Sequence, residues 1–263
     1  MSVPQLAPHT VATVAADLRA LGLTGGDTVI VHSSVRSIGF VAGDVQAVVR
    51  ALLDVLGPAG TLVVPTHTPG NTDPADWVNP PVPADWWPVI RANGPGFDPL
   101  RTPSHRMGIL PETVRTWPGA RRSDHPQVSF AALGAEAAEI VADHAPAEAF
   151  GDGSPLGAIY RLGGKVLLIG CGHRRNTSLH LAEARQEQPP MTDYGSAVLG
   201  PDGAARWLTW TAPDHDVVHF EEIGAAFEAT GAVTIGTVGE ATARLMPQRE
   251  LVDFATGWLA RVS

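Results

Sequence analysis

The feature that most constrains the fold is a strand–helix–strand pattern near the N-terminus. Two short apolar runs, 28–32 and 61–65, flank an amphipathic segment, 44–56, which the pair Gly57-Pro58 ends. Short runs rich in Val and Leu are typical of strands buried on both faces. Strands joined through a helix favour parallel pairing. A third apolar run, 165–169, also precedes a helical segment, so the sequence predicts an α/β fold.

Composition bounds the remaining possibilities. The chain has 263 residues, a net charge of −9 and one cysteine, and no linker divides it, so we predict a single domain, 1–263. The acidic balance argues against nucleic acid or an anionic membrane as the main partner. Because Cys171 is the only cysteine in the sequence, an internal disulfide and a metal or iron–sulfur site built from several cysteines are excluded. Without a signal peptide pattern or an apolar run of 18 residues, we expect a cytoplasmic protein.

Two acidic segments point to a cationic ligand. Residues 69–103 hold nine prolines and three of the seven tryptophans, with a net charge of −3 between positions 70 and 100. A long irregular segment of this kind indicates a lid or a binding loop, although disorder is the other reading. Residues 212–222 carry four carboxylates and no Lys or Arg. Either segment alone fits a solvated surface, but the two together suit a polyamine-like molecule.

Two strand-to-loop transitions are candidate sites. The stretch His32-Ser33-Ser34-Val35-Arg36-Ser37 follows the first strand, and its hydroxyls and backbone N–H groups suit an anion. The stretch 170–183 leads from a strand into a helix, with Asn176 or Thr177 as the expected N-cap. On that helix His180, Glu183 and Glu187 share one face, which suits a general base oriented by a carboxylate. An ordinary turn and a surface histidine remain the alternatives.

Other chemistry is weakly indicated. His215 and His219 have the i, i+4 spacing of metal ligands, but no third ligand is indicated, so we expect no metal. The sequence lacks a G-x-S-x-G nucleophile elbow, a Walker loop and a G-x-G-x-x-G fingerprint after a strand. Cys171 follows a strand, but a small buried apolar role suits it better than that of a nucleophile.

Four stretches in order along the chain resemble the aminoglycoside 3-N-acetyltransferases, antibiotic N-acetyltransferases that lack the GNAT fold. They are VHSSVRSIGFVAGDVQAVVRALLDVLGPAGTLVVPTHT at 31–68, MGILPETVRTWPGARRSDHPQVSFAALG at 107–134, SPLGAIYRLGGKVLLIGCGHRRNTSLHLAEAR at 154–185 and FEEIGAAFE at 220–228. The resemblance implies a central mixed, partly parallel sheet flanked by helices. It also implies acetyl-CoA as donor and the 3-amino group of an aminoglycoside antibiotic as acceptor. The segment 70–103 is then a substrate-side loop insertion.

The resemblance also implies roles for individual residues. His180 is the catalytic base and Glu183 its orienting or substrate-facing carboxylate; we expect the Thr177 hydroxyl to hold the thioester oxygen. Direct transfer needs no metal and no acyl-Cys171. His219 stands where the family pattern has acidic residues ahead of a phenylalanine. The residues expected to bind the coenzyme are His32, Ser33, Ser34, Val35 and Ser37. Those expected to bind the antibiotic are Asp73, Trp77, Glu183, Asp214, Asp216 and Glu221.

Three alternatives stay open on the sequence alone. The first is an acyltransferase of the same fold that acts on a different amine. The second is a non-catalytic protein that binds coenzyme A or a nucleotide, and the third is a hydrolase that uses the His–carboxylate pair with water. A panel of amine acceptors distinguishes the first alternative from an aminoglycoside acetyltransferase. Turnover of acetyl-CoA without any amine identifies the hydrolase. We expect a monomer or a homodimer.

Overall fold

A seven-stranded sheet forms the centre of the computed structural model, which describes residues 5–262. Its strands lie in the order β3 (Arg121–Arg122), β4 (Phe130–Gly134), β2 (Thr61–Pro65), β1 (Thr28–Ser33), β5 (Lys165–Ile169), β9 (Ala241–Pro247) and β8 (Thr234–Val238). The central strand β1 is parallel to both β2 and β5, whereas β4 and β9 are antiparallel to their inner neighbours. The prediction of a mixed, partly parallel sheet is confirmed.

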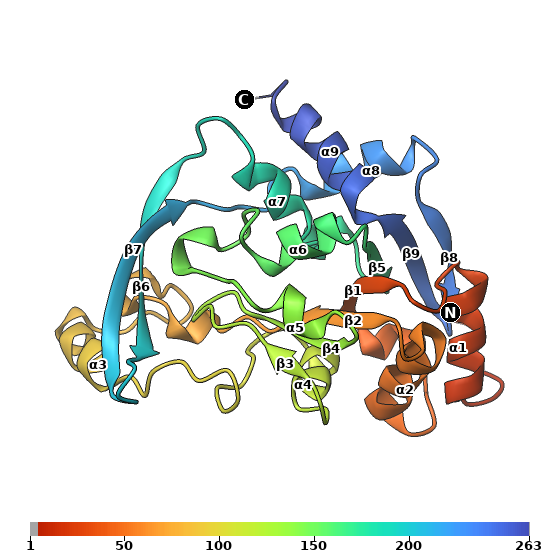
Figure 1. Ribbon diagram of the computed structural model, residues 1–263, viewed down its shortest axis with the longest axis horizontal. Coiled ribbons are helices and arrows are strands. Elements are labelled where there is room, and N and C mark those ends of the chain that lie inside the picture. Colours follow the sequence, from red (N-terminus) through yellow and green to blue (C-terminus); the bar gives the residue numbers. More distant parts are fainter. Residues whose placement is uncertain (1–4, 263) are drawn as a thin grey trace.

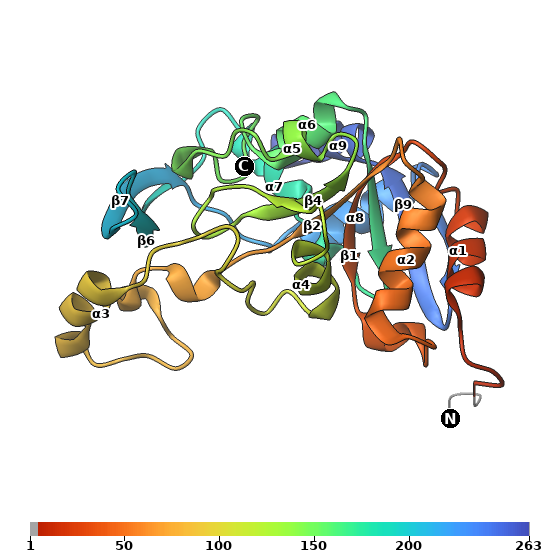
Figure 2. The same cartoon turned by 60° about the horizontal axis from the view of Figure 1, so that its bottom comes forward.

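Helices cover both faces of the sheet. One face carries α1 (Val11–Ala20), α2 (Asp44–Leu56) and α4 (Ile109–Arg115). The other carries α5 (Ala137–Ile140), α6 (Pro155–Arg161), α7 (Leu179–Ala184), α8 (Phe220–Glu228) and α9 (Gln248–Leu259). Figures 1 and 2 show the sheet between these layers. Alternate residues of β5 point to opposite cores, Leu167 to the first and Leu168 to the second, which explains the continuous apolar runs.

The predicted strands at 28–32, 61–65 and 165–169 are present, with ends that differ by a residue at most. The sequence analysis missed β9, and the C-terminal helix begins after it at Gln248. In β9 the exposed or half-buried Thr242 and Arg244 alternate with the buried Ala243 and Leu245. This period-2 pattern is typical of a strand whose two faces differ in burial.

A two-stranded hairpin, β6 (Met191–Leu199) and β7 (Ala205–Pro213), lies apart from the main sheet, at the end of the molecule far from α1 (Figure 1). The irregular segment 70–103 packs against it and contains short 3-10 turns and one helix, α3 (Trp87–Asn93), which the sequence analysis did not predict. Backbone and side-chain hydrogen bonds join this segment to the hairpin. Phe97 N–H donates to Ala197 O (2.9 Å), and Ser196 Oγ donates to Asn71 O (2.6 Å).

None of the helices within residues 5–262 combines the length and the apolar composition that crossing a membrane requires.

His144 is a buried histidine with both ring nitrogens used in the fold. Its Nδ1 lies 2.8 Å from Ser123 Oγ, and its Nε2 lies 2.8 Å from Ala149 O. Burial and the neighbouring His125 lower the pKa of His144 to about 3. In the unfolded chain the ring titrates near its ordinary pKa of 6.5. Between these values only the unfolded state binds the proton, so this contribution to stability is lost as the pH falls from 6.5 towards 3.

We expect acidification from pH 7 to pH 5 to lower the free energy of unfolding by about 2 kcal/mol through His144 alone. His144→Gln should make the urea unfolding midpoint less dependent on pH across this range. His219→Gln, at an exposed position, is the matched control and should keep the wild-type dependence. An equally steep dependence in His144→Gln would contradict the assignment.

Candidate active site

The two predicted transitions meet at one edge of the sheet. Because β1 and β5 are parallel neighbours, their carboxyl ends lie side by side, with Ser33 opposite Ile169. Ser34 N–H donates to Ile169 O (2.8 Å), and the Cys171 thiol lies 3.4 Å from His32 O. The chain leaves β1 towards β2 on one side and reaches β5 on the other, which makes this edge a topological switch point, the usual place for a ligand.

Gly170 allows the two turns to approach each other. Its φ is +64°, and a Cβ built there would lie only 1.7 Å from Ser37 Oγ. A side chain at position 170 would therefore clash with Ser37. The Ser37 hydroxyl donates to Ser34 O (2.6 Å) inside this turn. Ser37, predicted to bind the coenzyme, thus holds the turn together and does not line the cavity described next.

A cavity of about 650 Å³ opens at this edge. Six of the predicted site residues line it: His32, Ser33, Ser34, Val35, Thr177 and His180. Four arginines, Arg36, Arg106, Arg174 and Arg175, also line it, and none of its described lining residues carries a carboxylate. The Ser33 hydroxyl is buried without a hydrogen-bond partner in the described part of the chain. This combination of cations and an unsatisfied hydroxyl suits an anionic, elongated ligand.

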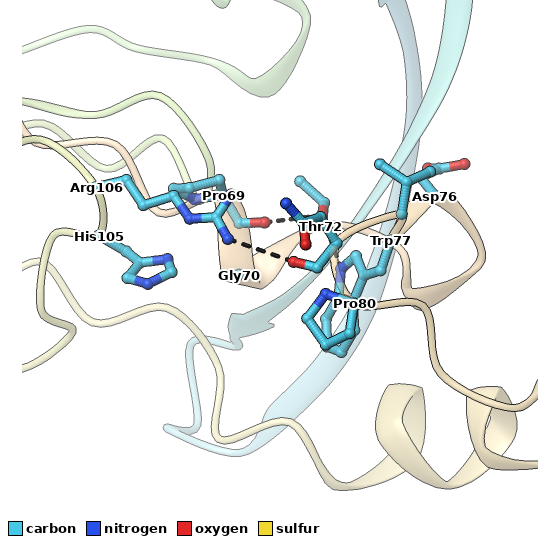
Figure 3. A pocket seen from close by; sticks show the side chains of 10 residues that line it. Pro69, Gly70, Thr72, Asp76, Trp77, Pro80, His105 and Arg106 are labelled. Carbon is cyan, nitrogen blue, oxygen red and sulfur yellow. Dashed lines mark hydrogen bonds between the residues drawn. The ribbon is translucent and has the colours of Figure 1, made fainter.

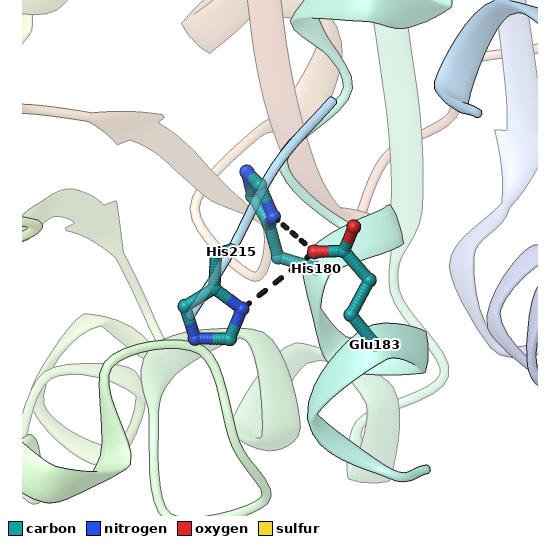
Figure 4. Close-up of side chains that lie close together, drawn as sticks. All are labelled: His180, Glu183 and His215. Atoms are coloured by element: carbon teal, nitrogen blue, oxygen red, sulfur yellow. Dashed lines mark hydrogen bonds and ion pairs between the residues drawn. The ribbon is translucent and has the colours of Figure 1, made fainter. Parts of the chain in front are cut away.

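His180 lies on α7 at the wall of this cavity (Figure 4). Its Nδ1 is 2.7 Å from Glu183 Oε2, one helical turn further along. The Phe150 ring stacks on the His180 ring, with centroids 4.4 Å apart and an angle of 15°. Burial lowers the pKa of His180, although Glu183 acts in the opposite direction. The ring is therefore neutral near pH 7, with the proton on Nδ1 and a lone pair on Nε2.

Glu183 supplies the charge of this group. Burial alone would raise the pKa of Glu183, but the hydrogen bond from His180 and the nearby His215 outweigh it and lower the pKa below its ordinary value. The carboxylate is thus ionised beside a neutral imidazole, which is the state that orients a general base. Glu183 is the carboxylate in contact with His180. Asp216 acts on the pKa of His180 only at longer range, and Asp214 and Asp216 are both exposed.

His215 is the third member of the group, and the sequence analysis paired it with the wrong residue. Its Nδ1 lies 3.6 Å from Glu183 Oε2, whereas His219 lies 3.6 Å from Glu222 and near Trp258. Donor atoms of His180, Glu183 and His215 lie within 4.8 Å of one another, and zinc accepts both imidazole nitrogen and carboxylate oxygen. The 2.7 Å hydrogen bond already accounts for the closest pair.

His32 and Thr177 join the two transitions across the cavity. The Thr177 hydroxyl oxygen lies 3.4 Å from His32 Nε2. Burial, and to a lesser extent His180, lower the pKa of His32 to about 3. His32 is therefore a neutral hydrogen-bonding partner for Thr177 and adds no positive charge to the cavity.

The local helix prediction needs two corrections. The helix α7 begins at Leu179 with Ser178 as N-cap, and neither Asn176 nor Thr177 caps it. Asn176 Oδ1 instead accepts from Ser178 N–H (3.3 Å) in the preceding turn. The helix ends at Ala184, so Glu187 is exposed beyond it and does not share the face of His180.

The predicted antibiotic-binding residues are dispersed. Asp73 forms a two-bonded ion pair with Arg91 (2.6 and 3.1 Å), which neutralises its charge within the segment 70–103. Trp77 Nε1–H donates to Thr72 Oγ1 (3.0 Å) beside a second cavity of about 340 Å³ (Figure 3). Arg106 lines both cavities. Glu221 accepts from Arg174 N–H (2.8 Å), so it holds the turn before α7.

Sequence reasoning missed two parts of the site. Phe150 lies in a turn with no motif, and nothing in its surroundings indicated that it stacks on His180. The arginines were visible in the sequence, and Arg174 and Arg175 stand within a stretch already singled out. Their common position at the cavity follows from the pairing of β1 with β5 and could have been expected once both transitions were placed at one edge.

Comparison with known proteins shows which family this chain resembles along most of its length. A family model described as Aminoglycoside 3-N-acetyltransferase matches residues 30–260. Aminoglycoside N(3)-acetyltransferase VII of Streptomyces paromomycinus is 39% identical, over 96% of this chain and 92% of that protein. The prophage-derived aminoglycoside N(3')-acetyltransferase-like protein YokD of Bacillus subtilis is 39% identical, over 95% and 92%.

Solved structures agree with this similarity. The crystal structure of YokD matches with a TM-score of 0.92, over 96% of this chain and 99% of that one. The binary complex of AAC-IIIb with CoASH matches with a TM-score of 0.87 and 32% identity, over 97% of each chain.

Cys171 lines the cavity, but its chemistry is that of a thiol. Burial raises the pKa of Cys171 to about 11, against an ordinary value of 9.0. Near neutral pH the thiolate fraction is thus about 100-fold lower than for an unperturbed cysteine. We expect alkylation of Cys171 by iodoacetamide at pH 7.5 to be at least about 100-fold slower in the folded protein than in urea. Equal rates, followed by mass spectrometry, would show an activated thiolate instead.

Proposed function

The chain belongs to the aminoglycoside 3-N-acetyltransferase family, and we propose that it transfers the acetyl group of acetyl-CoA to the 3-amino group of an aminoglycoside, with His180 as general base. The observation that carries this proposal is the neutral His180, hydrogen-bonded to an ionised Glu183 at the wall of a cavity lined by arginines. The similar protein AAC-IIIb binds CoASH, and the relative from Streptomyces paromomycinus is an aminoglycoside N(3)-acetyltransferase.

The cavity fits the coenzyme in its two chemical parts. Arg36, Arg174 and Arg175 are exposed cations at its rim and suit the phosphates. Apolar side chains deeper in the site suit the acyl-bearing arm; they include Val31, Val35, Phe150 and Phe220. The unpartnered Ser33 hydroxyl offers a hydrogen bond to an amide or carbonyl of that arm. Among the residues expected to contact the coenzyme, His32, Ser33, Ser34 and Val35 keep that assignment.

The chemistry requires a proton acceptor but no activated enzyme nucleophile. The acceptor is an ammonium ion in water; it gives up one proton to His180 Nε2, and the lone pair of the resulting amine attacks the thioester carbonyl. A C–N bond forms, the C–S bond breaks, and the leaving sulfur takes the electron pair and the second ammonium proton. The products are the amide, free CoASH and one proton passed to solvent. General base action of this kind contributes about 10²- to 10⁴-fold.

Two neighbours support the base. The ionised Glu183 holds the proton of His180 on Nδ1, so that Nε2 is the acceptor, and it stabilises the imidazolium that forms. The Thr177 hydroxyl, 3.4 Å from His32 Nε2, is the side chain that would stabilise the thioester oxygen as it gains charge. Burial raises the pKa of Cys171 to about 11, which disfavours an acyl-cysteine intermediate and supports direct transfer.

The acceptor side is acidic where the coenzyme cavity is cationic. Asp214 and Asp216 are exposed on the segment that carries His215, between β7 and α8. Together with Glu183 they attract a polycation towards His180. The segment 70–103, with Trp77 beside the smaller cavity, is the proposed substrate-side loop, but Arg91 already neutralises Asp73. That internal ion pair favours a second candidate, a transferase of the same fold that acts on a less cationic amine.

Thiol release from acetyl-CoA tests the function directly. We expect release only when an aminoglycoside is present, and a loss of about 10²- to 10⁴-fold in kcat for His180→Asn. Glu183→Gln should lose less, because the amide still orients the ring. The panel includes aminoglycosides and monoamines.

Each departure has a defined meaning. Release without any amine would identify a hydrolase. Release with monoamines but with no aminoglycoside would establish the second candidate. Full activity in His180→Asn would remove His180 as the base.

The acidic segment predicts a salt-dependent KM. The double variant Asp214→Asn, Asp216→Asn should raise the KM for a polycationic acceptor several-fold at low ionic strength and flatten its dependence on salt. The KM for acetyl-CoA should stay the same. Asp54→Asn, an exposed change on α2, is the control for net charge. If that control raises the KM equally, the attraction is not local.

A further inference from the structure

His215 has a buried nitrogen with no hydrogen-bond partner in residues 5–262. The side chain is 8% exposed, its Nδ1 is among the buried atoms without a partner, and the acidic atom nearest to it is Glu183 Oε2 at 3.6 Å. Its ring lies edge-on to Phe150 and to His180, with centroids 4.9 and 5.4 Å away. Figure 4 shows both histidines directed at the same carboxylate.

This arrangement fixes the tautomer of His215. A lone pair on Nδ1 would face a carboxylate oxygen and be repelled, whereas an N–H there faces an acceptor. The proton of a neutral His215 therefore belongs on Nδ1. His180 also holds its proton on Nδ1, so two N–H groups face one oxygen of Glu183. A second N–H dipole at 3.6 Å makes that oxygen a weaker acceptor for the His180 N–H at 2.7 Å.

We propose that His215 is a positioning residue that competes with His180 for Glu183 and so limits how strongly the carboxylate holds a proton on His180. This inference rests on the proposed function for its kinetic consequence, but the competition itself is a property of the substrate-free protein. A base that is too strongly held by its carboxylate stays protonated at working pH and cannot accept the amine proton.

The charges around His180 are consistent with this role. His215 acts to lower the pKa of His180, against the raising effect of Glu183 and of Asp216 on the same segment. From the sheet, His32 on β1 and His67 after β2 face His180 as neutral rings. Arg174 and Arg175 line the same cavity. On α9, which packs against α7, Asp253 accepts a hydrogen bond from the Tyr160 hydroxyl and forms an ion pair with Arg185.

Three substitutions separate the donor from the ring. His215→Phe keeps an aromatic ring against Phe150 but removes the N–H. His215→Asn keeps an N–H near the position of Nδ1. His219→Phe makes the same change four residues along, where the side chain is 45% exposed and faces Glu222. All three are checked for folding by thermal unfolding before use.

The first measurement does not depend on turnover. Imidazole ¹⁵N spectra of the substrate-free protein follow the titration of His180. We expect its midpoint to rise in His215→Phe, to return towards the wild-type value in His215→Asn, and to stay unchanged in His219→Phe. An unchanged or lowered midpoint in His215→Phe overturns the proposal.

The second measurement is the pH profile of kcat/KM for acetyl transfer. In His215→Phe the acid limb should move to higher pH, so that kcat/KM at pH 6, relative to its plateau, falls about three- to tenfold below wild type. His215→Asn should restore the profile. A uniform loss at every pH in His215→Phe would mean that His215 only packs, and it would overturn the proposal. A wild-type protein without transfer activity would refute the proposed function, while the spectra would still decide the role of His215.

Discussion

The parallel pairing of β1 with β5 is the interaction on which the rest of the structure depends. It brings Ser33 and Ile169 to one level, and the bond from Ser34 N–H to Ile169 O closes the edge. Both turns must then fit in the same small space, which requires a glycine at position 170. The larger cavity, the contact between His32 and Thr177 and the place of α7 all follow from this one register.

The local parts of the fold were predictable, because buried strands and amphipathic helices have distinct patterns of apolar residues. The pair His180 and Glu183 was also predictable, because both residues lie on one helical turn. His215 was not. Its place beside Glu183 depends on how the β6–β7 hairpin returns the chain to the sheet, which is a matter of tertiary packing. The stacking of Phe150 on His180 is non-local in the same way, since thirty residues separate the two rings.

The site also separates charge across His180. Arginines line the cavity, and Asp214 and Asp216, on the segment that carries His215, are exposed to solvent. Under the proposed function, this division keeps the anionic donor and the cationic acceptor from competing for the same surface. His180 lies between the arginines and the carboxylates. A change in its protonation therefore alters the electrostatic potential on both sides. Burial, which lowers the pKa of His180, keeps the ring uncharged near neutral pH.

The hairpin β6–β7 has a consequence for how such a protein changes over generations. Its strands hold the segment 70–103 through Asn71 and Phe97, and the chain that leaves β7 carries His215 to Glu183. Under the proposed function, one element therefore connects the choice of acceptor with the strength of the base. Substitutions selected for a new antibiotic on this side of the molecule would then also change the pH at which the transfer runs best. Specificity and pH optimum would be inherited together.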